Sequence, residues 1–154
     1  MTVNNLKTGD NAIQVIQHYE GKFNTAYLDP VGIATIGYGH TKDVYIGQSA
    51  TDDEIIQFLK EDLEDTEHWV NLFVTVPLNQ DQFDALISFT FNLGSGNLHS
   101  STLLKLLNQG HYDQVHVQML RWNLAGGEPA RGLTYRRLTE GHLFDTGEII
   151  FGNV

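Results

Sequence analysis

The chain has 154 residues, 41% of them hydrophobic and 18% charged, as expected of a folded protein with one core or two small lobes. It contains no cysteine, which excludes disulfides and thiol chemistry. The net charge of -10 argues against a nucleic-acid partner, because binding to phosphates requires clustered basic residues. We find neither an apolar run long enough to span a membrane nor the features of a secretory signal peptide. We therefore expect synthesis in a reducing cytoplasm, without stable insertion into a membrane.

The first part of the chain predicts a short helix followed by a β-hairpin. Residues 11–20 have apolar side chains at helical spacing, with Asp10 as the expected N-terminal cap and Gly21 as the expected end. Residues 24–41 are β-like and are interrupted by a turn signal at Asp29-Pro30.

A long helix should follow, starting at a capping box formed by Thr51 and Glu54. One face is apolar (Ile55, Leu59, Leu63, Thr66, Val70 and Phe73), and the other is strongly acidic. Residues 51–75 hold eight acidic residues and one lysine, so most of the negative charge lies here. We interpret this acidic face as solvated surface and not as a binding site.

The remainder of the chain reads as helical. A second capping box, Asn79 with Gln82, begins one helix, and Ser100 or Ser101 begins another that ends near Gly110. Further helices are expected over 112–122 and 133–144, with a surface loop at 126–129. The predicted fold is α+β, mostly helical, in one domain. It has a small hairpin lobe (about 13–50), a connecting helix (about 51–74) and a helical lobe (about 75–154). A cleft between two such lobes is a natural substrate site.

Two carboxyl groups are candidates for acid–base chemistry. Glu20 falls at the C-terminal end of the first helix, where the helix dipole and partial burial disfavour the ionised form. Asp29 lies nine residues later in an exposed turn, where it should stay ionised. Such a pair of unlike carboxyls is what most glycosidases use. A glutamate at a helix end is nevertheless usually surface, and Asp-Pro is common in turns, so spacing alone does not decide the matter.

A longer motif carries more information. Glu20-Gly21, Leu28-Asp29-Pro30 and Thr35-Ile36-Gly37-Tyr38-Gly39-His40-Thr41 stand in one ordered pattern. This pattern resembles the active-site signature of phage-type lysozymes, the endolysins of glycoside hydrolase family 24. The similarity continues through 78–96, 101–110, Arg121-Trp122 and 132–140, and spans roughly residues 11–145.

The resemblance implies a lysozyme-like two-lobed fold and a muramidase that hydrolyses the β-1,4 bond between N-acetylmuramic acid and N-acetylglucosamine in peptidoglycan. Glu20 would be the general acid, Asp29 would hold or activate the attacking water, and Thr35 would help to position it. The family is regarded as inverting, so water would attack the face opposite the leaving group.

The resemblance also assigns supporting residues. Phe91 and Asn92 would line the far wall of the cleft and bind sugar, and His40 would be a structural hydrogen-bonding residue. A cation beside Glu20 is expected from the last helix, where Arg136 and Arg137 both match, and the resemblance also makes both arginines candidates for substrate binding. One of these two arginines could instead pair with Glu140 at helical spacing. The sequence leaves open which arginine faces Glu20.

No cofactor or metal is expected, because the seven histidines show no metal-binding spacing. The expected partner is the peptidoglycan glycan strand, acted on in the periplasm or cell wall by a monomer. The chain's acidity suggests delivery by a holin or other machinery. Two alternatives stay open: a catalytically silent peptidoglycan-binding or structural module, and a lytic transglycosylase, which would not need Asp29 to position water.

Overall fold

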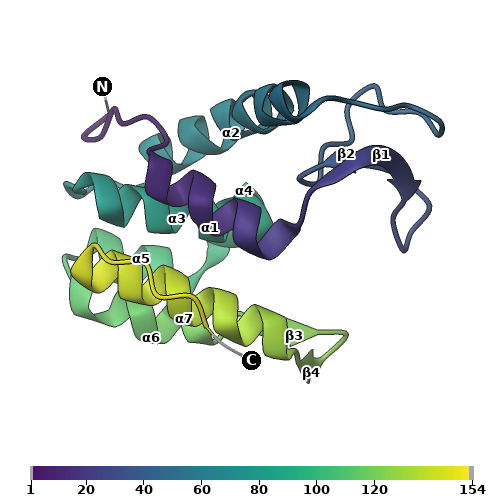
Figure 1. Ribbon diagram of the computed structural model, residues 1–154. Coiled ribbons are helices and arrows are strands. Elements are labelled where there is room, and N and C mark those ends of the chain that lie inside the picture. The colour runs from purple at the N-terminus through teal and green to yellow at the C-terminus, as the bar shows by residue number, and fades with distance from the viewer. Residues whose placement is uncertain (1, 153–154) are drawn as a thin grey trace.

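The structure, a computed structural model, describes residues 2–152 and confirms a mostly helical α+β fold (Figure 1). Its first elements are α1 (Asp10–Glu20), β1 (Phe23–Leu28), β2 (Ala34–Gly37) and the long α2 (Asp52–Phe73). The rest is helical except for one short hairpin: α3 (Gln80–Leu93), α4 (Ser95–Ser100), α5 (Thr102–Asn108), η1 (Tyr112–Gln114), α6 (Val115–Leu120), β3 (Leu124–Ala125), β4 (Glu128–Pro129) and α7 (Arg131–Thr146). Among the described residues, no helix has the length and apolar character needed to cross a bilayer.

The first helix is capped differently from the prediction. Its N-cap is Gly9, and Asp10 is already the first helical residue, so Asp10 does not cap it. The capping acceptor comes from α3 instead, where the Asp84 carboxylate accepts the backbone N–H groups of Gly9 (2.9 Å) and Ala12 (3.4 Å). An acidic side chain from another helix thus supplies the negative charge that a helix N-terminus favours.

This cap gives a prediction about pH. Burial raises the pKa of Asp84 above its ordinary value of 3.8, although hydrogen bonds from Gly9 and Gln80 oppose the shift. A folded-state pKa above the unfolded value means that stability is greatest below the unfolded pKa and falls as the pH rises through the folded pKa. We expect the free energy of unfolding of the wild type, relative to that of Asp84→Asn, to fall as the pH is raised from below 3.8.

Urea unfolding of both proteins across this pH range tests the prediction, because other groups titrate alike in the two proteins and cancel in the difference. A wild type that gains stability over Asp84→Asn with rising pH would show that the hydrogen bonds to the carboxylate outweigh its burial.

The helical lobe forms around α3, and α1 belongs to this lobe. Residues 83–90 of α3 are all buried, and α1, α2 and α7 each pack against this helix. α1 also packs against α7, so the first and last helices that the structure describes are in contact. The hairpin lobe therefore starts after Glu20, and not near residue 13 as the sequence suggested. Gly21, with φ of 77°, ends α1 and turns the chain toward β1.

The hairpin predicted over 24–41 forms from β1 and β2. The two strands are antiparallel, with Tyr27 opposite Thr35 and Leu28 opposite Ala34. β2 packs against the N-terminal part of α2, and a Cβ on Gly37 would lie 3.0 Å from the Ile55 side chain. Glycine is required at position 37 both for this approach and for its φ of 65°.

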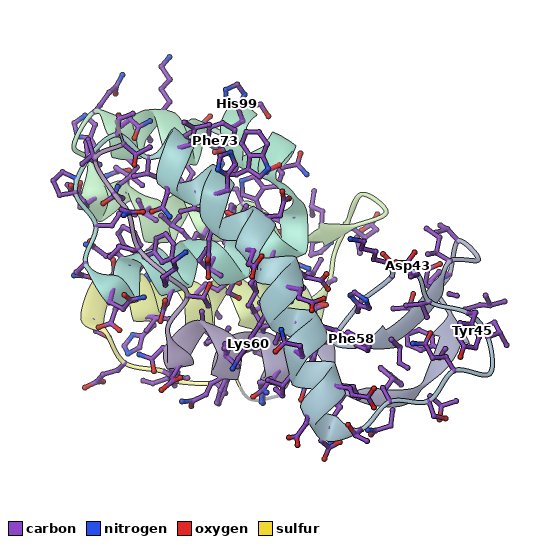
Figure 2. All side chains as sticks on the ribbon, turned by 90° about the horizontal axis from the view of Figure 1, so that it is seen from above. Asp43, Tyr45, Phe58, Lys60, Phe73 and His99 are labelled. Atoms are coloured by element: carbon purple, nitrogen blue, oxygen red, sulfur yellow. The ribbon has the colours of Figure 1, made fainter. Side chains whose placement is uncertain are left out.

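α2 forms as predicted and runs from the hairpin lobe along the helical lobe (Figure 1). Its capping box is complete, since Thr51 Oγ1 accepts from Glu54 N at 3.2 Å and Thr51 N donates to Glu54 Oε1 at 2.9 Å. The predicted apolar face is buried from Ile55 to Val70. Figure 2 shows Phe58 beside the hairpin lobe and Phe73 near the other end of the helix.

The second capping box, at Asn79 and Gln82, also forms, and Ser101 (not Ser100) caps α5. Two features were not predicted. α4 is a separate short helix after Gly94, and residues 124–129 form the β3–β4 hairpin in place of the expected loop. Its turn consists of Gly126 and Gly127, which both have positive φ, as a two-residue hairpin turn requires.

Candidate active site

Glu20 is the last residue of α1, and its side chain is 23% exposed. Its Oε2 lies 2.8 Å from Arg136 Nη1 on α7. Of the two candidate arginines, Arg136 is therefore the one that faces Glu20. The Glu20 carboxyl thus lies at the C-terminal end of the α1 dipole and is paired with a buried guanidinium.

Behind Glu20 lies a buried group of charges, which we call the arginine–glutamate cluster: Arg136, Arg137 and Glu140 of α7, with Ser88 of α3. Glu140 Oε2 lies 3.2 Å from Arg136 Nε, and Glu140 Oε1 lies 2.9 Å from Arg137 Nε. Ser88 donates its hydroxyl to Glu140 and accepts from Arg136 at its carbonyl oxygen, at 3.2 Å. Together with Glu20, the cluster balances two positive charges with two negative ones.

Both arginines are too buried to lie on the open wall of a cleft, with 3% exposure for Arg136 and none for Arg137. The direct substrate contact that the sequence suggested for them is not part of this geometry, because their guanidinium groups are used by Glu20, Glu140 and Asn92. Burial lowers the pKa of Arg137 below its ordinary value, and the charge of Glu140 opposes that shift. Their position indicates a supporting role.

Asp29 follows β1 and opens the turn toward β2. Its Oδ1 accepts the backbone N–H groups of Val31 (3.0 Å) and Ile33 (2.8 Å), so the side chain holds its own turn in shape. Within residues 2–152, no protein donor is placed against its other oxygen, Oδ2. One carboxylate oxygen is thus structural, and the other is available to a ligand.

Thr35 lies on β2, close to the Asp29 turn, and is buried. Its hydroxyl donates to the carbonyl oxygen of Ile33 at 2.9 Å. The backbone N–H of the same Ile33 donates to Asp29 Oδ1. Asp29 and Thr35 are therefore brought together through Ile33. In the described part of the chain, no hydrogen bond links this pair to Glu20, which belongs to the other lobe.

His40 contacts α2, as a structural residue would. Its Nδ1 lies 2.9 Å from Asp62 Oδ2, and its ring stacks on Phe58 with centroids 4.4 Å apart. The residue joins the hairpin lobe to the connecting helix. Sequence reasoning did not identify Asp62 as its partner, because the carboxyl is one of many on the acidic helix.

Phe91 and Asn92 lie near the C-terminal end of α3, and both are partly exposed. Asn92 Oδ1 accepts from Arg137 Nη2 at 2.6 Å, which connects Asn92 to the arginine–glutamate cluster. No sequence pattern indicated this contact or the role of Ser88. Among residues 2–152, no three His, Cys, Asp or Glu side chains are grouped as ligands of a metal would be.

Most glycoside hydrolases use two carboxyl residues. Here the helical lobe holds one carboxyl beside an arginine, and the hairpin lobe presents a second. The family model described as phage lysozyme matches residues 17–140. The chain is 39% identical to the endolysin of Bacillus phage B103 over 88% of its length, although it spans only 53% of that relative. It is 38% identical to the endolysin of Salmonella phage P22, with 86% of this chain and 94% of the relative covered.

Among solved structures, the endolysin from Escherichia coli O157:H7 phage FAHEc1 superposes with a TM-score of 0.88 at 30% identity. That comparison covers 97% of this chain and 99% of the endolysin. The chain belongs to the phage lysozyme family. It is therefore an enzyme of the glycoside hydrolase class, as the sequence motif predicted.

Proposed function

We propose that this enzyme is a muramidase that hydrolyses the β-1,4 bond between N-acetylmuramic acid and N-acetylglucosamine in bacterial peptidoglycan. The observation that carries the proposal is the different setting of the two carboxyls. Glu20 ends a helix and contacts Arg136, whereas Asp29 lies in a turn with one oxygen free. Its relatives named endolysins and lysozymes support the same reaction.

In this mechanism Glu20 donates a proton to the glycosidic oxygen as the bond from that oxygen to the anomeric carbon breaks. A water molecule forms the new bond to the anomeric carbon from the opposite face and gives up a proton to Asp29. The free Oδ2 of Asp29 suits this role, since its Oδ1 is held by two backbone N–H groups. Thr35 would support the water from β2, and inversion at the anomeric carbon follows.

The remaining assignments concern binding and delivery. Phe91 and Asn92 would line the cleft on the side of the helical lobe, and His40 would hold the hairpin lobe to α2. We propose action as a monomer in the periplasm or cell wall after delivery by a holin or comparable machinery. The net charge of -10 fits this dependence, because an acidic protein is not attracted to an anionic envelope.

Analysis of the products from purified peptidoglycan tests the proposal. We expect fragments with a free reducing end that borohydride reduces, formed first as the α-anomer. A 1,6-anhydro product, which borohydride does not reduce, would instead show a lytic transglycosylase. Binding to sacculi without any product would show a catalytically silent module, and either of these two results would refute the proposal.

A further inference from the structure

The side-chain amide of Asn92 is held in one orientation. Arg137 Nη2 lies 2.6 Å from Asn92 Oδ1. A guanidinium carries only donors, so it must face the carbonyl oxygen of the amide and not its NH₂ group. In the part of the chain that the structure describes, no acceptor is placed against Asn92 Nδ2. The amide therefore presents its two N–H donors, and no acceptor, to whatever lies in front of it.

Arg137 is itself fixed. Its side chain is fully buried, its Nε lies 2.9 Å from Glu140 Oε1, and its guanidinium lies 5.1 Å from the ring centroid of Phe89. Glu140 is held in turn by Ser88 and Arg136. A rotation of the Asn92 amide would leave an arginine donor unpaired in the interior, which is costly. The orientation is thus imposed from the interior of the helical lobe.

The position of Asn92 on α3 connects it to the residues around Glu20. It follows Ser88 by one turn of α3, so the two residues share a face of the helix. The carbonyl oxygen of Ser88 binds Arg136, which binds Glu20. Asn92, a partly exposed residue, therefore belongs to the same assembly as the proposed catalytic acid.

We propose that Arg137 is a positioning residue that makes Asn92 a donor-only contact for an amide carbonyl oxygen of the substrate. A sugar hydroxyl both donates and accepts, so it would bind either orientation of the amide, and a fixed orientation would bring no advantage. A carbonyl oxygen only accepts. In peptidoglycan such oxygens belong to the N-acetyl groups and to the peptide stems. The inference rests on the proposed muramidase activity.

Asn92→Asp tests the proposal, because the substitution preserves shape and the acceptor for Arg137 but removes the outward donors. We expect KM on soluble glycan strands to rise by about tenfold or more, the equivalent of about 1.4 kcal/mol, with a smaller change in kcat. The melting temperature should not fall, since a carboxylate pairs with Arg137 at least as well as an amide oxygen.

Two further variants provide the controls. Asn92→Ala should raise KM and also lower the melting temperature, because it leaves Arg137 without its acceptor. Gln109→Glu adds the same charge at an exposed position at the end of α5 and should leave KM unchanged. If KM rose as much for Gln109→Glu as for Asn92→Asp, the added negative charge alone would explain the effect, and the proposal would be overturned.

Two other results would also overturn it. An unchanged KM for Asn92→Asp would show that substrate binding does not use the Asn92 N–H donors, and a clear loss of stability would show that the amide does not turn its oxygen to Arg137. Strands with and without peptide stems identify the source of the carbonyl oxygen. A raised KM of Asn92→Asp on both kinds of strand assigns an N-acetyl group, and a raised KM on stem-bearing strands alone assigns the peptide.

Cleavage by the wild type tests the muramidase proposal separately, because it does not depend on the variants.

Discussion

Glu20→Gln is expected to lower kcat on peptidoglycan by about 10²- to 10⁴-fold, the usual contribution of a general acid. Glutamine has nearly the same shape as glutamic acid and can still accept from Arg136, so the local geometry should be retained. It cannot give a proton to the leaving oxygen. Release of reducing ends from permeabilised cells or purified sacculi, at equal concentrations of folded protein, measures the loss.

Glu64→Gln is the matched control, because Glu64 is an exposed carboxyl on α2 and the substitution makes the same change of charge. Its activity should equal that of the wild type. Equal activity of Glu20→Gln and the wild type would move the catalytic acid to another residue while leaving the family assignment intact.

The second large effect concerns stability. Glu140→Gln should reduce the free energy of unfolding by about 3–5 kcal/mol, the usual cost of removing one partner from a buried ion pair. Glu140 is fully buried and contacts both Arg136 and Arg137. After its loss, two buried guanidinium groups remain with a single carboxylate, Glu20, which contacts Arg136. Denaturant unfolding followed by circular dichroism measures the change.

Glu148→Gln provides the comparison, since the Glu148 side chain is 75% exposed and lies 3.9 Å from His142. An exposed pair of this kind contributes about 0–1 kcal/mol. Pairing Glu140→Leu with Arg137→Met should cost less than the sum of the single changes, because the double variant leaves no unpaired charge at these two positions. Strictly additive costs would show that the two residues do not interact.

Much of the fold could be predicted because its signals are local. The capping boxes at Thr51 and Asn79, and the apolar stripe of α2, are patterns within a few residues, and the structure contains all three. The end of α1 at Gly21 could be predicted as well, because glycine adopts the positive φ that often ends a helix and this preference belongs to the residue itself. The order of Glu20, Asp29 and Thr35 was also readable, because the three residues stand close together in the sequence.

The features that sequence reasoning missed depend on contacts between distant residues. Glu20 and Arg136 are 116 residues apart, and Asn92 and Arg137 are 45 apart, so no periodicity could choose between adjacent arginines. The cap of α1 comes from Asp84, 75 residues beyond Gly9, which explains why Asp10 was the wrong choice. The β3–β4 hairpin has strands of two residues, too short for an alternating pattern to show.

The packing of α1 against α7 has a consequence for the protein during translation. The ribosome produces Glu20, Asp29 and Thr35 well before Arg136 and Glu140. Until α7 has emerged, the nascent chain carries the signature residues without the partner that holds Glu20. A nascent chain that has not yet reached α7 therefore lacks the residue that holds Glu20, so the proposed site can form only after α7 has emerged.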